Sequence, residues 1–410
     1  MSRPPLGPVT VTGLGAVSAW GWRTEDFWRG LLTGAPAIER PSRMDLEGHR
    51  TDLASEVPEG GAPAEGSSGS LSRADRFAVA AAVEAWRESG LDRAGIDLGR
   101  VGVYFGGSTA AMDEGEEFFR RLVGERQGWP RISWLAAHPL NAPGDAVARA
   151  LGSAGPVESL SSACASGGLA IGSALEALRA GEVDVAVAGG SDSLCHLTYA
   201  GFNSLRAIDA ELCRPFRAER SGLNLGEGAG VLILERPDHA AERGARSLGR
   251  VAGAGASCDA HHMTAPHPEG EGAARAIRAA LEDAGVTARS VSFINAHGTG
   301  TPLNDRAESG ALREVFGERV ASLPVTSTKG VVGHFLGSSG AIEAVATLLC
   351  LRHRVVHATP GDGPADPALG VDLVLGEPRS LERASAAVST SFAFGGSNAA
   401  VVLTRESAAA

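Results

Sequence analysis

The stretch VESLSSACASGGLA, residues 157–170, joins a short strand-like run to an alanine-rich helical pattern. It predicts a strand at 157–161, and the alanines and leucines after Cys164 predict a helix over 165–180. A strand followed by a tight turn and a helix is the repeating unit of layered α/β proteins. The stretch therefore indicates an α/β fold in which Cys164 stands at the start of a helix.

The same alternation continues on both sides of this stretch and predicts a layered α/β fold for the whole chain. A polar run at 236–250 separates two α/β-patterned halves, which we assign as 1–250 and 251–410. The Gly-, Pro- and Ser-rich segment 58–70 is expected to be a mobile surface loop. Further strands are expected at 8–13, 101–106, 184–189, 229–235, 291–295, 323–327, 386–391 and 399–404, and further helices at 24–33, 72–89, 270–284, 305–316 and 338–351.

Length, net charge and cysteine content exclude several classes of protein. The chain has 410 residues and 43% hydrophobic content, enough to bury a large core. Its net charge of −11 argues against nucleic acid or an anionic membrane as a partner. There is no signal-like apolar segment and no 18-residue apolar run, so we expect a cytoplasmic protein. Five irregularly spaced cysteines predict reduced thiols rather than disulfides or a zinc site.

Cys164 is the candidate nucleophile. The partial positive charge of a helix N-terminus favours a thiolate, and Gly167 and Gly168 allow other groups to approach closely. A buried structural cysteine remains the alternative interpretation. The other four cysteines lack this context and are assigned to packing: Cys195, Cys213, Cys258 and Cys350.

Two histidines stand in settings equivalent to that of Cys164. His297 and His334 each follow a strand-like run and precede a helical pattern, where α/β proteins place their working groups. A structural role is the alternative for either one. A Cys-His-His set differs from a hydrolase triad because the second imidazole adds an N–H donor. Two donors can hold the enolate oxygen that forms when a malonyl thioester loses carbon dioxide. The glycines after Phe394 permit a turn that binds a second oxyanion, with an ordinary tight hairpin as the alternative.

Other interpretations are weaker. Val11-Thr-Gly-Leu-Gly-Ala-Val-Ser18 has a serine where a dinucleotide-binding loop has its third glycine. Asp259, His261, His262 and His267 match no zinc spacing, and we expect no metal. A Cys-dependent hydrolase or simple acyltransferase would leave His334 without a role, and a non-enzymatic scaffold would leave Cys164 unlabelled by acyl donors.

Seven motifs in this order resemble the β-ketoacyl-acyl-carrier-protein synthases of the thiolase-like superfamily, over nearly the whole chain and most strongly the fatty-acid elongating and type II polyketide ketosynthases. Each motif is weak evidence alone, whereas the ordered set is strong. They are Val11-Thr-Gly-Leu-Gly-Ala-Val-Ser, Ser162-Ala-Cys-Ala-Ser, Arg214-Pro-Phe, Gly226-Glu-Gly-Ala-Gly, Asn295-Ala-His-Gly-Thr, Lys329 with Gly333-His, and Phe394-Gly-Gly-Ser-Asn.

The resemblance implies a five-layer αβαβα fold and a decarboxylative condensation. Cys164 is implied to hold an acyl thioester, which malonyl-acyl-carrier protein extends after His297 and His334 bind its thioester carbonyl. Lys329 and Glu343 are implied to organise the site with Asp305 in support, while Phe394 gates it and lends a backbone N–H to the oxyanion hole. Thr299 and Thr301 are implied to contact the phosphopantetheine arm.

The resemblance also implies partners. The substrates are carried on acyl carrier protein, and no permanently bound cofactor is expected. The chain would form a homodimer, or a heterodimer with a chain-length-factor-like ketosynthase. Whether its pathway makes fatty acids, polyketides or polyenes, and from which acyl chain, is left open. The arginines expected to dock the acidic carrier are Arg73, Arg76, Arg131 and Arg206, with solvated surface arginines as the alternative.

Overall fold

The computed structural model describes residues 7–63 and 71–406. Its strands are β1 (Val9–Val17), β2 (Val101–Gly106), β3 (Val157–Leu160), β4 (Val185–Asp192), β5 (Gly228–Glu235), β6 (Gly249–Cys258), β7 (Val291–Asn295), β8 (Pro324–Thr326), β9 (Val355–Val356), β10 (Asp372–Leu373), β11 (Arg379–Ser380), β12 (Ala386–Phe392) and β13 (Ser397–Thr404). Its α-helices are α1 (Thr24–Leu32), α2 (Arg73–Ser89), α3 (Met112–Leu122), α4 (Ile132–Ala136), α5 (Ala142–Leu151), α6 (Ser166–Ala180), α7 (His196–Ser204), α8 (Pro237–Glu242), α9 (Glu271–Asp283), α10 (Pro302–Phe316), α11 (Lys329–Val332) and α12 (Ser339–His353).

The main sheet contains the same strand arrangement twice. Its order is β10-β8-β7-β12-β13-β6-β1-β5-β4-β2-β3, and β1 pairs antiparallel with β6 at the centre. From β1 outward, the pairings are antiparallel, antiparallel, parallel and parallel. From β6 outward through β13, β12, β7 and β8 the same series recurs. The two halves are therefore similar in topology, although their sequences show no visible repeat.

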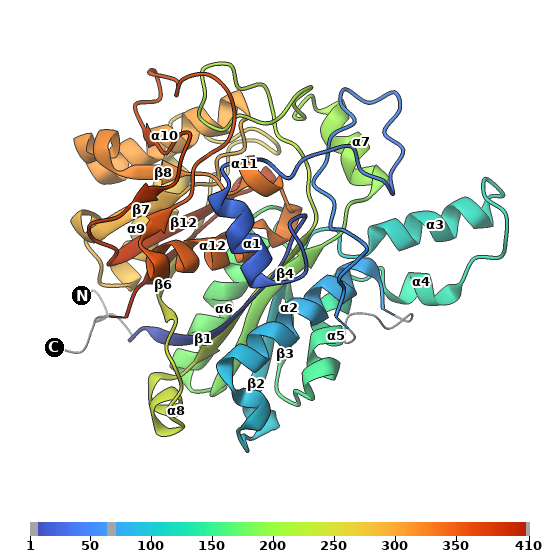
Figure 1. Ribbon diagram of the computed structural model, residues 1–410, viewed down its shortest axis with the longest axis horizontal. Coiled ribbons are helices and arrows are strands. Elements are labelled where there is room, and N and C mark those ends of the chain that lie inside the picture. The colour runs from blue at the N-terminus through green and yellow to red at the C-terminus, as the bar shows by residue number, and fades with distance from the viewer. Residues whose placement is uncertain (1–6, 64–70, 407–410) are drawn as a thin grey trace.

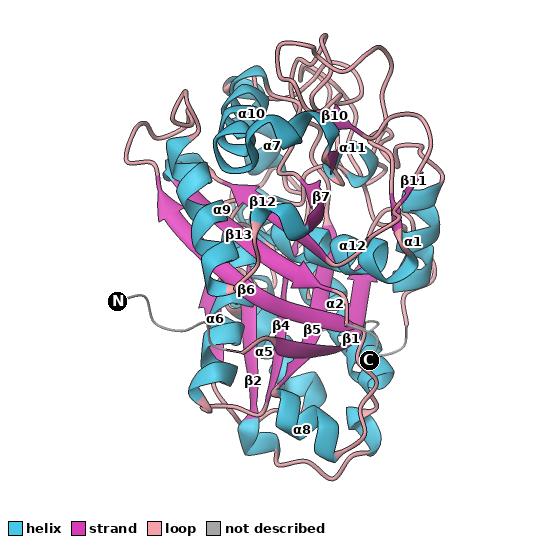
Figure 2. Cartoon of the chain, turned by 90° about the vertical axis from the view of Figure 1, so that its left-hand side faces the viewer, coloured by secondary structure: helices cyan, strands magenta, loops and turns pink. Residues whose placement is uncertain are grey.

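Helices α6 and α12 form the central layer of the protein (Figure 2). Both contact strands of each half of the sheet, α6 through β2, β4 and β6 and α12 through β5 and β12. Helix α2 covers the outer face of the first half, and α9 covers the outer face of the second half. The result is the five-layer αβαβα fold that the sequence predicted.

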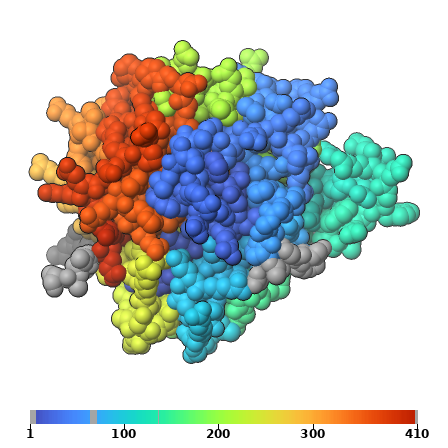
Figure 3. All heavy atoms as spheres, in the orientation of Figure 1, coloured from blue at the N-terminus to red at the C-terminus, as the bar shows by residue number. Residues whose placement is uncertain are grey.

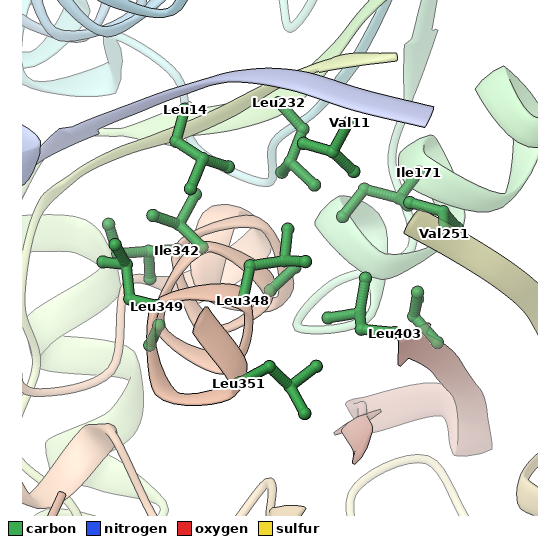
Figure 4. Close-up of a cluster of buried hydrophobic side chains, with 14 of the residues drawn as sticks. Val11, Leu14, Ile171, Leu232, Val251, Ile342, Leu348, Leu349, Leu351 and Leu403 are labelled. Carbon is green, nitrogen blue, oxygen red and sulfur yellow. The ribbon is translucent and has the colours of Figure 1, made fainter. Parts of the chain in front are cut away.

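The core lies where these layers meet. Leu348 of α12, Leu232 of β5 and Leu403 of β13 belong to one buried cluster (Figure 4). Helix α12 is buried on every side from Ser339 to Leu351, as expected for a helix between two sheets. Each fully buried leucine stabilises the fold by about 1.5–3 kcal/mol. This packing fixes the N-terminal ends of α6 and α12 relative to each other.

The glycines of β1 allow α2 to pack closely against the strand. A Cβ on Gly13 would lie 2.0 Å from the carbonyl oxygen of Ala85, and one on Gly15 would lie 1.9 Å from that of Ala81. Residues Val9–Val17 form one continuous strand rather than a phosphate-binding loop. These glycines therefore serve helix packing, and the dinucleotide interpretation is wrong.

The structure adds elements that the sequence did not suggest. Strand β6 was missed because its Gly-Ala-Gly-Ala centre lacks β-branched residues, but Gly253 and Gly255 let α9 approach within contact distance. Helices α3 and α4 were also missed, and they form an arm that extends from the body (Figures 1 and 3). Residues 64–70 of the predicted mobile loop lie outside the described residues. The division of the chain into halves at residue 250 stays a prediction. In the structure, β1 of the first half pairs with β6 in one continuous sheet.

Candidate active site

Cys164 stands on a sharp turn between β3 and α6. Ala163, directly before it, has a φ of 45°, a left-handed conformation that is unusual for alanine. The Ser166 hydroxyl holds this turn, since it donates to the Ala163 carbonyl at 2.6 Å and accepts from the Ser162 N–H at 2.8 Å. Helix α6 begins at Ser166, as the sequence predicted within one residue. The turn thus fixes the backbone on both sides of the Cys164 thiol.

The resting form of Cys164 is the thiol. Burial raises the pKa of Cys164 to about 12, while the nearby Lys329 charge acts in the opposite direction. Loss of water on burial therefore opposes the thiolate that the helix N-terminus favours. The Phe394 backbone N–H forms a hydrogen bond to Cys164. A proton acceptor must consequently act when the sulfur attacks.

His297 is fixed as a neutral N–H donor. Burial, together with the Lys329 charge, holds the pKa of His297 well below its ordinary value. The Lys329 Nζ lies 3.1 Å from Nδ1 of His297. Since an ammonium can only donate, Nδ1 is the acceptor and the ring proton is on Nε2.

His334 has the same tautomer for a different reason. The Leu336 backbone N–H donates to Nδ1 of His334 at 2.9 Å, and the Ser339 Oγ lies 2.9 Å from the same atom. Burial holds the pKa of His334 well below its ordinary value, so the ring is neutral with its proton on Nε2. The His297 and His334 rings lie 5.5 Å apart between centroids and nearly perpendicular, at 88°.

Lys329 and Glu343 form a buried ion pair beneath the histidines. Burial raises the pKa of Glu343 to about 7, and the Lys329 charge opposes this. Lys329 is the single lysine of a chain that contains 36 arginines. A position that accepted either cation would almost always hold arginine here, so the compact ammonium is required at this site. The occurrence of one lysine among 37 basic residues is visible in the sequence, and the prediction of Lys329 did not make use of it.

One cavity of about 240 Å³ brings the predicted residues together. Cys164, His297 and His334 line it, and Phe394 covers it in a stack with Phe202 of α7, with ring centroids 5.4 Å apart. Gly395 and Gly396 have φ values of 85° and 79°, which glycine adopts without strain. Thr299, Thr301, Arg206, Asn304 and Leu303 also line the cavity.

The acidic residues behind His297 position its loop. Glu308 of α10 accepts the N–H groups of His297 and Gly298, each at 2.8 Å. Asp305 accepts the Phe216 N–H at 2.7 Å, which ties the Arg214-Pro-Phe motif to the same helix. Burial raises the pKa of Asp305 to about 7. Sequence reasoning found Asp305 but missed Glu308, which lies three residues after Asp305 on the same helix and could have been found by that spacing.

The four predicted docking arginines have different environments. Arg73 is 4% exposed, and its Nε donates to both carboxylate oxygens of Glu227 at 2.9 and 3.0 Å. Its assignment as a docking residue is therefore wrong, because its charge is buried in an ion pair. Arg206 is exposed and lines the cavity. Arg76 is half-buried with its guanidinium over Trp22, and Arg131 is exposed beside α4.

The polar loop after β6 is held by hydrogen bonds, and its residues Thr264, Ala265 and Pro266 line the active-site cavity. Asp259 accepts the Asn398 side-chain amide at 2.7 Å and the His267 N–H at 2.9 Å. The His261 and His267 rings contact edge to face. Among the described residues, no group of three or more His, Cys, Asp or Glu side chains could hold a metal ion. In the same part of the chain, the helices are too short or too polar to cross a membrane.

Comparisons with known proteins agree with this geometry. Family models for the N-terminal and C-terminal domains of β-ketoacyl synthases match residues 7–240 and 248–361. The chain is 36% identical over 406 residues to "3-oxoacyl-[acyl-carrier-protein] synthase 2" of Staphylococcus aureus strain N315, covering 96% of this chain and 97% of that protein.

Solved structures of ketosynthases superpose on the whole chain. The ishigamide ketosynthase/chain length factor matches with a TM-score of 0.90 and 32% identity, over 98% of this chain and 100% of the other. A type II PKS acyl-carrier protein in complex with its ketosynthase bound to the hexaketide matches at 0.89 and 30%, over 99% and 100%. The fold, the cysteine and histidine geometry and these matches lead to one conclusion: the chain belongs to the β-ketoacyl synthase family, acyl-transferring enzymes that form carbon–carbon bonds.

Proposed function

We propose that the chain is a β-ketoacyl-acyl-carrier-protein synthase that condenses an acyl group on Cys164 with malonyl-acyl-carrier protein. The observation that carries the proposal is the convergence of Cys164 with two neutral imidazoles, both protonated on Nε2. Two such donors at one cavity stabilise an enolate oxygen. The identity of this chain to 3-oxoacyl-[acyl-carrier-protein] synthase 2 supports the same substrate class.

The first half-reaction transfers the acyl group to the enzyme. The Cys164 sulfur attacks the carbonyl carbon of an acyl thioester on the carrier's phosphopantetheine arm. The oxyanion accepts the backbone N–H groups of Cys164 and Phe394, and the carrier leaves as its free thiol, having taken the proton that Cys164 lost. The proton passes from the thiol, whose pKa is about 12, to the leaving thiolate of the carrier, since Nδ1 of each imidazole already accepts a hydrogen bond and Nε2 already carries a proton.

The second half-reaction forms the carbon–carbon bond. Malonyl-acyl-carrier protein replaces the free carrier, and His297 and His334 donate to its thioester oxygen. Loss of carbon dioxide leaves an enolate whose carbon attacks the Cys164 thioester. The carbon–sulfur bond to Cys164 breaks, and a β-ketoacyl chain two carbons longer remains on the second carrier. Cys164 leaves as a thiolate and takes up one proton from solvent, which completes a ping-pong cycle.

The remaining predicted residues position the catalytic groups or bind the carrier. Lys329 holds His297 in its tautomer, while Glu343 neutralises Lys329 and Asp305 braces the loop. Thr299 and Thr301 contact the phosphopantetheine arm in the cavity that they line. Arg206 offers the carrier a positive charge at the rim, and Arg76 and Arg131 extend this surface. We expect no permanent cofactor and a cytoplasmic location.

A second chain completes the assembly that we propose. Strand β3 is an edge of the sheet, with β2 as its neighbour there. The arm formed by α3 and α4 exposes large apolar side chains, which are Phe119, Leu122, Val123, Trp129 and Ile132. Such an edge and patch favour burial by another chain. The partner is a second copy or a chain-length-factor-like ketosynthase, as in the ishigamide complex.

The test of the proposal is product analysis with acyl- and malonyl-acyl-carrier protein. A synthase releases carbon dioxide and yields a β-ketoacyl carrier two carbons longer. A Cys-dependent hydrolase or simple acyltransferase instead yields free acid or an unextended acyl group, and this outcome would overturn the proposal. Varying the acyl donor in the same assay assigns the chain to a fatty-acid, polyketide or polyene pathway.

A further inference from the structure

A series of contacts connects the arm, formed by α3 and α4, to the stacked rings of Phe202 and Phe394 at the active site. The Glu116 carboxylate of α3 accepts the Leu197 N–H at 2.6 Å and the His196 N–H at 3.1 Å. These are the first two residues of α7. A carboxylate at a helix N-terminus pairs with N–H groups that otherwise have no partner in the helix. Glu116 therefore sets where α7 begins relative to the arm.

Helix α7 carries Phe202 into the active site. The Phe202 ring stacks on Phe394 with an interplanar angle of 22°, and its centroid lies 6.4 Å from that of His334. The backbone N–H of Phe394 in turn forms a hydrogen bond to Cys164. The position of α7 thus affects a donor that the proposed acylation step requires.

The joint between arm and body contains free space. A second cavity of about 260 Å³ lies between α3 and the segment before α7, lined by Glu116, Trp134, Cys195 and His196 among others. Asp113, one turn earlier on α3, accepts the Ser193 hydroxyl at 2.8 Å. Two carboxylates of α3 therefore contact the segment that leads into α7, and they carry the position of the arm to that helix.

Resting on the proposed function, we infer that Glu116 is a positioning residue for acylation. Through α7 and Phe202 it holds the Phe394 N–H where the oxyanion develops on the carbonyl attacked by Cys164. Glu116 touches no substrate. Because α3 and α4 also carry the apolar patch, a partner chain seated on the arm would stabilise the acylation-competent arrangement.

The test compares two reactions of Cys164. Acylation by an acyl-carrier protein passes through an oxyanion and requires the Phe394 N–H. Alkylation by iodoacetamide displaces iodide without forming an oxyanion, so it reports on the accessibility and the thiolate fraction of Cys164 and does not require an oxyanion hole. The matched control is Glu117→Gln, since Glu117 is the next residue of α3 and pairs with Arg121 and Arg126 on the arm itself.

We expect Glu116→Gln to slow acylation about tenfold, the effect of weakening one charge-assisted hydrogen bond, and to leave alkylation within about twofold. Glu116→Asp should recover part of the acylation rate, and Glu117→Gln should change neither rate. Equal loss of both rates in Glu116→Gln, or an acylation rate matching that of Glu117→Gln, would overturn the inference alone. A wild-type chain that acyl-carrier protein does not acylate overturns the proposed function and the inference with it.

Discussion

The Nζ atom of Lys329 lies 3.1 Å from Nδ1 of His297 and is ion-paired with Glu343 on its other side. The contact fixes which nitrogen of His297 carries the proton, because the ammonium has no lone pair to offer. The single lysine of the chain is therefore placed where its charge determines the direction of a hydrogen bond to substrate.

Removing this charge should separate stability from activity. Lys329→Met leaves Glu343 buried without a partner and should lower the free energy of unfolding by about 3 kcal/mol. The double variant Lys329→Met/Glu343→Gln removes both charges and should recover most of that stability. It should still lose about 100-fold or more in kcat, because His297 can then adopt the tautomer that accepts rather than donates. Denaturant unfolding and steady-state kinetics measure the two effects, and full activity in the double variant contradicts the role of Lys329.

The resting thiol of Cys164 predicts a characteristic pH dependence. Only the thiolate reacts with iodoacetamide, and a pKa of about 12 keeps its fraction small at neutral pH. The alkylation rate of Cys164 should rise about tenfold per pH unit from pH 7 to 10 without a plateau. Peptide mass spectrometry separates this reaction from that of the exposed Cys258. A plateau below pH 8 would show that the thiolate is already stabilised in the resting enzyme.

Asp305 should make the folded chain more stable as the pH falls. Burial raises its pKa to about 7 from an ordinary value of 3.8, so the folded state binds a proton more readily than the unfolded state. The stabilisation that results is complete below pH 3.8 and is lost as the pH rises through 7. Asp305→Asn cannot titrate. The stability of wild type relative to this variant should therefore increase from pH 8 to pH 5 in denaturant unfolding, and a constant difference contradicts the shift.

Glu308 should matter for the chemical step although it does not reach the cavity. It holds the backbone of His297 and Gly298 with one carboxylate oxygen each. Glu308→Gln retains one acceptor and loses the other, so His297 should shift from its position. We expect kcat to fall about tenfold with little change in KM, since the displaced group acts mainly in the transition state. Glu314→Gln, an exposed position on the same helix, is the control.

Site residues could be predicted from the sequence where the motif that marks them lies within one short segment, and could not where their role depends on residues distant in the chain. Cys164, His297 and His334 were identifiable because each follows a strand and precedes a helix, and parallel strands of the two halves bring such ends together. Strand β6 was not identifiable, because its small residues are explained only by α9 packing against it. Arg73 was misassigned since its partner Glu227 is distant in sequence. The raised pKa of the Cys164 thiol also required the structure, because its main cause is burial, which the sequence does not show.

The central claim is that Cys164 holds the acyl group while His297 and His334 act on the malonyl thioester. Its most direct test is peptide mass spectrometry of the chain after incubation with acyl-carrier protein bearing an acyl group, followed by malonyl-acyl-carrier protein. The account predicts an acyl adduct on Cys164 that disappears when malonyl-acyl-carrier protein is added, and an adduct that persists in His334→Ala. An unmodified Cys164, or an adduct on another cysteine, would contradict it.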